Sequence, residues 1–330
     1  MAERFADRER LRKDPGVGGQ THETKDHRRG NPYSLLSGKD LFPPCARGCV
    51  ERRPRIVRVD EEVEKDLLDP PPLFSSLSAV AAPLLTRCPV LLDDGVLLAV
   101  AKPDGVLSHP NPGGARAACA FEGRYDPAVR RFDGPAGAIW LVHRLDQDTS
   151  GVLLAVRREE TAAACRAFFE QRRVRKSYLA LVRDLPRPAQ GRWQDRLVKR
   201  AEKGAVRSAV GRGGTPNAEL AYRIGKNLAA AHCSLLQIVL ITGRTHQIRV
   251  QAAARGHPVA GDRLYGDFTW NRALRAHADL RRLFLHALRL EFPHPRDGAP
   301  VRIEAPLPAE LRAALDALGG CREGRKFGGS

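Results

Sequence analysis

The sequence of 330 residues contains no long, uninterrupted run of apolar residues. Its most apolar stretch, Leu77–Val100, is broken by prolines and charged residues, which excludes a membrane-spanning helix there. Met1–Lys13 alternates charges, has no apolar core and contains acidic residues, so it resembles neither a secretory signal nor a mitochondrial transit peptide. We therefore expect a cytoplasmic protein with no membrane partner.

The seven cysteines are odd in number and widely spread, which does not indicate a disulfide framework. Reduced thiols agree with a cytoplasmic protein. His22, His27, Cys45 and Cys49 could in principle hold Zn²⁺, but their order and spacing match no standard finger. The alternative is four scattered polar residues, and we predict no metal site.

Several catalytic motifs are also missing. There is no glycine-rich phosphate loop followed by lysine, and no serine, histidine and aspartate order that indicates a hydrolase triad. Pro44-Cys45 is followed by Cys49, one residue too far for the cysteine pair of a zinc deaminase. We therefore expect neither a nucleotide cofactor nor zinc-dependent deamination.

Acidic residues are scarce relative to basic ones: 38 against 55, a formal charge of +17. The excess is concentrated in residues 157–212, which hold 16 Lys and Arg but 6 Asp and Glu. This balance favours a polyanionic partner, nucleic acid before membrane, although a solvated, arginine-rich surface would give the same count. Arg172, Arg173 and Arg175 are candidate RNA contacts within this segment.

Apolar patterning places the folded region after about residue 85. Residues 1–85 are rich in charged residues, Gly and Pro, and we expect an N-terminal extension that is mostly disordered or loosely docked. Alternating or continuous apolar runs predict strands at Val96–Ala101, Ala138–Val142, Val152–Val156, Lys176–Val182, Ala218–Ile224, Leu235–Ile241, Leu288–Phe292 and Val301–Ala305. Helical spacing predicts helices at Glu159–Arg172, at His246–Arg255 with Thr245 as N-cap, and around Leu311, Leu315 and Leu318. Strands outnumber helices without a sustained βαβ alternation, so we predict an α+β fold on a largely antiparallel sheet.

The segment His143–Gly151 lies between two of these predicted strands and carries Asp146 and Asp148 beside Arg144. A loop on a rigid sheet is a common place for chemistry, although a polar turn with a capping aspartate is the simpler interpretation. A carboxylate in a basic cleft suits nucleophilic attack or stabilisation of an oxocarbenium-like centre. Both occur when a glycosidic bond is broken.

Five further segments accompany this motif: Lys102–Gly105, Arg175–Val182, Gly243–Val250, His257–Gly266 and Leu285–Ala287. In this order and at these distances the segments resemble the RluA-like family of RNA pseudouridine synthases, over roughly Pro89 to Leu318. The resemblance implies a pseudouridine-synthase-like fold with a mixed, mainly antiparallel sheet in two halves and a central catalytic cleft. It also implies a catalytic domain at 86–319, followed by a tail at 320–330 that we expect to be disordered.

The resemblance also implies roles for single residues. Asp146 would be the catalytic carboxylate, Arg249 its partner, and Tyr178 would line the uracil pocket. Whether Asp146 attacks C1′, adds to uracil C6 or removes the 2′-proton stays open. Electrostatics alone does not separate Asp146 from Asp148, and Asp262 is a weaker rival because Gly261-Asp262 also reads as a turn.

Three more residues would bind substrate. Arg144 would lie near the gap left by a flipped-out uridine, and Lys102 and Arg244 are candidate phosphate contacts. The predicted activity is isomerisation of uridine to pseudouridine in structured RNA by a monomer without a cofactor, with ribosomal RNA favoured over tRNA. The alternatives are a catalytically silent RNA-binding or ribosome-assembly protein of the same fold, and a glycosidase-like hydrolase.

Overall fold

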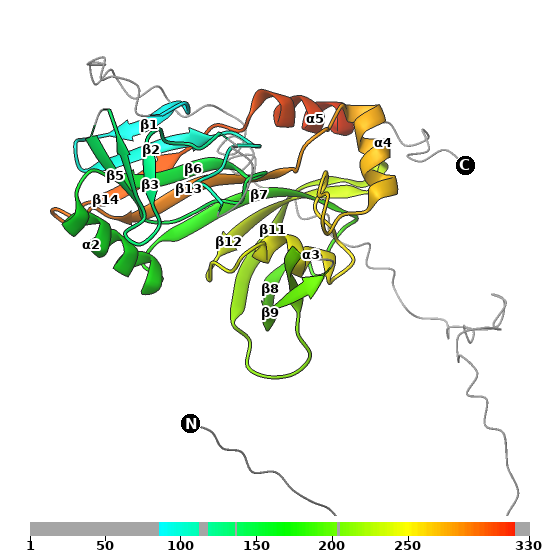
Figure 1. Ribbon diagram of the computed structural model, residues 1–330. Helices are drawn as coiled ribbons and strands as arrows, with labels where there is room; N and C mark the ends of the chain where they lie inside the picture. Colours follow the sequence, from blue (N-terminus) through cyan, green and yellow to red (C-terminus); the bar gives the residue numbers. More distant parts are fainter. Residues whose placement is uncertain (1–85, 112–117, 136, 203–204, 321–330) are drawn as a thin grey trace, which may run out of the picture. The chain divides into compact units, whose positions relative to one another are not determined.

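The computed structural model describes residues 86–111, 118–135, 137–202 and 205–320 (Figure 1). The predicted N-terminal extension, with its candidate zinc ligands, and the tail from 321 onward lie outside these described residues. Over the described ranges, no helix is long and apolar enough to cross a membrane. Within the same ranges, no group of three or more His, Cys, Asp or Glu side chains could hold a metal ion.

Strands dominate the described chain. In order they are β1 Val90–Asp93, β2 Leu97–Lys102, β3 Arg124–Asp126, β4 Arg131–Gly134, β5 Gly137–Leu141, β6 Ser150–Val156, β7 Arg175–Arg183, β8 Gln190–Asp195, β9 Leu197–Glu202, β10 Ala205–Val210, β11 Ala218–Leu228, β12 Cys233–Leu240, β13 Leu285–Pro293 and β14 Pro300–Glu304. The helices are α2 Glu159–Glu170, α3 Gln247–Ala253, α4 Phe268–Ala278 and α5 Ala309–Gly319, with a 3-10 turn η1 at Ala229–Ala231. The α+β prediction is confirmed.

Twelve strands form one sheet with the main path β3-β4-β5-β6-β13-β7-β12-β11-β8, and β1, β2 and β14 lie on side branches. Every pairing in this sheet is antiparallel except that of β6 with β13. The sheet is therefore mixed and mainly antiparallel, as predicted. β9 and β10 form a separate hairpin that extends away from the sheet near α3 (Figure 1).

The two halves of the sheet meet where β6 pairs with β13 through Ser150 opposite His286 and Gly151 opposite Ala287. Gly151 has a φ of +123°, and a Cβ atom there would lie 2.1 Å from the carbonyl oxygen of Ala287, so only glycine allows this approach. Oγ of Ser150 lies 2.9 Å from Nδ1 of His286 and accepts a hydrogen bond of 2.7 Å from Arg282. The chain that follows the His143–Gly151 segment is thus anchored to the second half of the sheet.

Helices cover each half of the sheet. In α2, Ala162 and Cys165 are buried on the side that packs against β5 and β6. α4 and α5 lie side by side (Figure 1), and their leucines pack on β7 and β12. The opposite face of β7 and β12 contributes Tyr178 to a third cluster, which α3 completes through Ile248. This arrangement leaves one end of β7 and β12 open to the predicted cleft.

All eight predicted strands are present, with ends shifted by a few residues. The hairpin of β13 and β14 and the final helix agree with the prediction. The helix predicted to reach Arg172 ends at Glu170, and Arg172 adopts a left-handed conformation with a φ of 59°. Sequence reasoning missed α4, which Asp267 caps by accepting a hydrogen bond from the amide of Trp270.

Candidate active site

The loop between β5 and β6 holds Asp146 between two anchored neighbours. Oγ of Ser108 donates to the carbonyl of Leu145 at 2.9 Å and accepts from the Leu145 amide at 3.0 Å. On the other side, the Lys102 ammonium donates to the carbonyl of Gln147 at 2.9 Å. Because the backbone is fixed before and after it, Asp146 presents its carboxylate in a defined direction.

The structure gives Lys102 a different role from the predicted one. Its side chain is 1% exposed, and its ammonium also donates to the carbonyls of Pro103 and Val106, both at 2.7 Å. An ammonium has three N–H donors, and here all three are used within the protein. These contacts do not favour the predicted phosphate contact, because the Lys102 ammonium holds the Asp146 loop.

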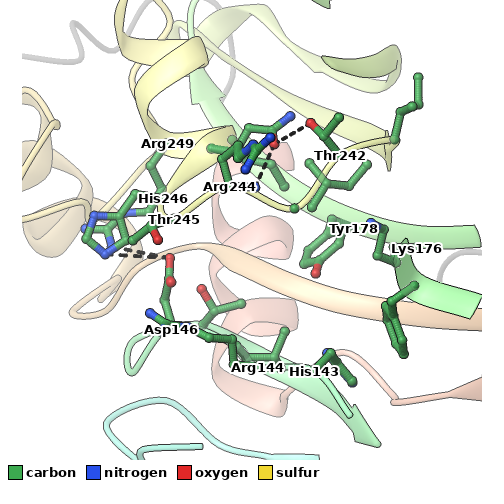
Figure 2. Close-up of a pocket in the computed structure, with 18 of the residues that line it drawn as sticks. His143, Arg144, Asp146, Lys176, Tyr178, Thr242, Arg244, Thr245, His246 and Arg249 are labelled. Atoms are coloured by element: carbon green, nitrogen blue, oxygen red, sulfur yellow. Dashed lines mark hydrogen bonds and ion pairs between the residues drawn. The ribbon is translucent and has the colours of Figure 1, made fainter. Parts of the chain in front are cut away.

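A cleft of about 570 Å³ opens between the two halves of the sheet (Figure 2). It is lined by the Asp146 loop, by β7, and by the segment that joins β12 to α3. The predicted site residues that line it are Arg144, Asp146, Tyr178, Arg244 and Arg249. The structure thus brings together five of the six predicted residues, from three separate segments of the chain.

Arg249 is fixed by a buried carboxylate. Its Nε and Nη2 donate to Oδ2 and Oδ1 of Asp262 at 2.7 and 2.8 Å, and its Nη1 lies 3.8 Å from Oδ2 of Asp146. Burial raises the pKa of Asp262, but the hydrogen bonds and charge of Arg249 outweigh it and hold that pKa below its usual range. Asp262 is fully buried, whereas the Asp146 side chain is 19% exposed and faces the cleft. The geometry makes Asp146 the accessible carboxylate and Asp262 the support of its cationic partner.

The second rival carboxylate, Asp148, does not line the main cleft. It lies along an adjoining hollow of about 400 Å³ that shares Asp146 and Arg249 with the cleft. Asp148 is therefore close to the site without facing Tyr178 across it.

Tyr178 projects from β7 into the cleft (Figure 2). Its side chain is largely buried, and burial together with the charge of Asp146 raises the pKa of the phenol well above its usual value. The hydroxyl therefore stays protonated at neutral pH. It can donate a hydrogen bond, and its ring offers a flat surface for a base.

His246, the N-cap residue of α3, lies near the Asp146 carboxylate. It takes a left-handed conformation, and its Nε2 lies 3.9 Å from Oδ2 of Asp146. Its Nδ1 is 3.0 Å from the hydroxyl of Tyr265, which in turn accepts a hydrogen bond from the amide of Ser208. Burial lowers the pKa of His246 despite the nearby Asp146, which favours the neutral imidazole.

The segment before α3 is shaped by Gln247. Its Oε1 accepts from the hydroxyl of Thr242 at 2.7 Å and from the amide of Arg244 at 3.0 Å. The predicted N-cap, Thr245, makes no capping hydrogen bond, and His246 occupies the N-cap position instead. The Gln247 side chain thus accepts the hydrogen bonds of the turn before α3, and the prediction that Thr245 caps the helix was wrong. Nε of Arg244 donates to the carbonyl of Asn217 at 3.1 Å, and Arg244 remains exposed at the cleft.

Sequence reasoning missed Lys176 as a site residue, although it precedes Tyr178 by two positions on the same strand. Side chains two apart on a strand share one face, so Lys176 also lines the cleft. The supporting role of Asp262 was also missed, because only the folded chain brings it to Arg249.

The comparisons with known proteins agree with this arrangement. A family model described as RNA pseudouridylate synthase matches residues 96–254. The ribosomal large subunit pseudouridine synthase C of Yersinia pestis is 38% identical over 284 residues, which cover 83% of this chain and 79% of that protein. The protein of the same name from Escherichia coli K12 is 36% identical over 242 residues, 71% of this chain and 70% of that protein. Among solved structures, human RNA pseudouridylate synthase domain containing 4 has a similar fold, with a TM-score of 0.51 and 22% identity, over 69% of this chain and 92% of that one.

Proposed function

Because this chain belongs to the RNA pseudouridylate synthase family, we propose that it converts specific uridines of large-subunit ribosomal RNA into pseudouridine. The predicted RluA-like membership and the predicted enzyme class are confirmed. The ribosomal target is supported by the names of the relatives that the chain matches over most of their length. Nothing in these comparisons favours the catalytically silent alternative.

The reaction is an isomerisation. The C1′–N1 bond of the uridine breaks, the uracil turns, C5 bonds to C1′, and the proton lost from C5 is balanced by the one gained at N1. No electrons are exchanged, so the proposed reaction requires neither a redox nor a nucleotide cofactor.

One observation carries the assignment of the reactive group. Asp146 is the carboxylate of the cleft that lies beside Arg249, whose cation is 3.8 Å away and forms no hydrogen bond to it. A carboxylate that is ionised and not engaged in a hydrogen bond to its partner is suited to react with the flipped uridine or to stabilise the cationic centre at C1′.

The other cleft residues receive roles from their positions. Tyr178 has a protonated hydroxyl and a ring facing the cleft, and we assign it to the wall of the uracil pocket. Arg144 is exposed on the Asp146 loop, where it can occupy the space from which the uridine is flipped. Arg244 is exposed at the opposite side of the cleft and is assigned to a backbone phosphate. We also propose that the protein acts as a monomer in the cytoplasm.

The test begins with total RNA from cells with and without this gene, in which every pseudouridine is mapped. We expect one or a few sites of large-subunit ribosomal RNA to revert to uridine. A transcript containing such a site should then be converted by the purified protein alone. An unchanged map would contradict the function, loss confined to tRNA would contradict the ribosomal target, and release of free uracil would indicate a hydrolase.

A further inference from the structure

Lys176 is a buried cation that faces the cleft. Its side chain on β7 is 8% exposed, and it lines the cleft beside Tyr178 (Figure 2). A Cβ atom at Gly243 would lie 3.8 Å from its ammonium nitrogen, so the ammonium sits next to the segment that leads into α3.

This ammonium has no anionic partner. Across the part of the chain that the structure describes, no carboxylate pairs with Lys176 and no acceptor receives its hydrogen bonds. Burial, helped by the charge of Arg172, lowers its pKa to about 8. A buried charge without a partner is unfavourable in the free protein, which suggests that the partner arrives with a ligand.

Arg172 supplies a second cation at the same end of the cleft. It follows α2 in a left-handed conformation with a φ of 59°, a position where glycine or asparagine is usual. This conformation is unfavourable for arginine, and such an outlier is a reason to look for a function. Here it places a guanidinium along the cleft and close enough to lower the pKa of Lys176.

The other charged and titratable groups near Lys176 do not neutralise it at neutral pH. His143 accepts a hydrogen bond from the Leu154 amide at its Nε2, and burial lowers its pKa to about 3, so its ring is neutral. Tyr178 keeps its proton, since its pKa is raised. Glu170 lines the same cleft from α2, but it does not pair with Lys176. The Lys176 end of the cleft is therefore positively charged.

We propose that Lys176 and Arg172 form a binding subsite for one backbone phosphate of the RNA, next to the target uridine. The inference rests on the proposed function, because the uracil pocket at Tyr178 defines where the target lies. Lys176 is two residues from Tyr178 on one strand face, about 6.6 Å along β7, which suits a phosphate near the nucleotide whose base contacts the tyrosine. A phosphate matches both cations, whereas a single uracil carbonyl would leave one of them unpaired.

Two neighbouring arginines serve as matched controls. The guanidinium of Arg173 lies 4.6 Å from the ring centre of Phe168, and Arg175 pairs with Glu291 at 3.4 Å. Neither lines the cleft. Of the three arginines predicted from the sequence to contact RNA, the structure thus favours Arg172 alone.

The experiment uses the full-length protein and a transcript that contains the uridine mapped in the gene-deletion comparison. Affinity is measured over a range of salt concentrations for wild type, Lys176→Gln, Lys176→Arg, Arg172→Gln and the controls Arg173→Gln and Arg175→Gln. Each lost phosphate contact should reduce the log–log salt slope by about 0.7 on single-stranded RNA. We expect this reduction and an affinity loss of about tenfold in Lys176→Gln, a smaller loss in Lys176→Arg, and little change in the controls.

Single phosphates of the transcript are then replaced by neutral methylphosphonates. One position should weaken binding of the wild type and leave Lys176→Gln unaffected, which identifies the phosphate that Lys176 binds. The melting temperature of Lys176→Gln should not fall, because the variant removes an unpaired buried charge. The subsite would be overturned if Lys176→Gln bound RNA with the affinity and the salt slope of the wild type. A lowered melting temperature with unchanged RNA binding would also overturn it. If the wild type binds this transcript but does not convert it, the proposed function fails, and the binding comparison still decides the subsite.

Discussion

Arg249 and Asp262 form a buried ion pair with two parallel hydrogen bonds of 2.7 and 2.8 Å. The side chains are 3% and 0% exposed. The pair leaves one nitrogen of Arg249 facing Asp146 at 3.8 Å. Asp262 therefore sets the orientation of the cation that faces Asp146, and its own carboxylate is fully buried.

Breaking this pair should destabilise the protein. Asp262→Asn leaves the Arg249 charge buried without its counter-ion, and we expect the free energy of unfolding to fall by about 3 kcal/mol. Urea unfolding at neutral pH measures the change, with Asp148→Asn as a control on a partly exposed carboxylate. A stability equal to that of the wild type would show that Asp262 does not hold Arg249 in solution.

We expect Lys102 to stabilise the Asp146 loop and not to contribute to the electrostatic binding of RNA. Lys102→Met removes three hydrogen bonds from a charged donor and leaves three carbonyls without it, at a cost on the order of 3 kcal/mol. Conversion should also slow, because the Gln147 carbonyl no longer anchors the residue after Asp146. The salt slope of RNA binding should stay at the wild-type value. A smaller salt dependence of RNA binding in Lys102→Met would instead support the phosphate contact predicted from the sequence.

Gly151 should be irreplaceable at the junction of β6 and β13. Gly151→Ala places a Cβ atom 2.1 Å from the Ala287 carbonyl oxygen, so the strands must separate and the two halves of the site move apart. Gly137→Ala is the matched control, because Gly137 also has a positive φ, of +102°, but a Cβ atom there would have no neighbour within 4 Å. We expect the control to lose about 1 kcal/mol and Gly151→Ala to lose several times as much, measured by urea unfolding. Equal losses would contradict the importance of the close approach.

The strands around the site were predictable because their apolar runs are long or alternate clearly, as in β6 and the β13–β14 hairpin. The carboxylate loop was predictable because it separates two such runs. The role of Lys102 could not be predicted, because its acceptors Val106 and Gln147 come together only through tertiary contact. The ion pair of Asp262 with Arg249 could not be predicted either, because the local sequence of Asp262 also suits a turn.

The lowered pKa of Lys176 makes the free energy of unfolding depend on pH. Its pKa is lowered from 10.5 to about 8, so between these values the unfolded chain holds more protons than the folded one, and wild-type stability gains with rising pH. A shift of this size corresponds to about 3 kcal/mol. The stability of Lys176→Gln relative to the wild type should therefore be greatest below pH 8 and decline towards pH 10.5. Urea unfolding of both proteins across this range provides the test, and a constant difference would contradict the buried, unpaired ammonium.

We propose that Asp146 carries the reaction. Asparagine keeps the size of the side chain but removes its charge and nucleophilicity, so Asp146→Asn should abolish conversion while RNA binding stays intact or tightens. Asp148→Asn should retain substantial activity and lose about 1 kcal/mol of stability at most. The measurement is pseudouridine formed per enzyme in a single turnover on the mapped ribosomal RNA transcript, with affinity determined separately. We expect no product from Asp146→Asn and product from Asp148→Asn; full activity in Asp146→Asn, or loss confined to Asp148→Asn, would contradict the catalytic role of Asp146.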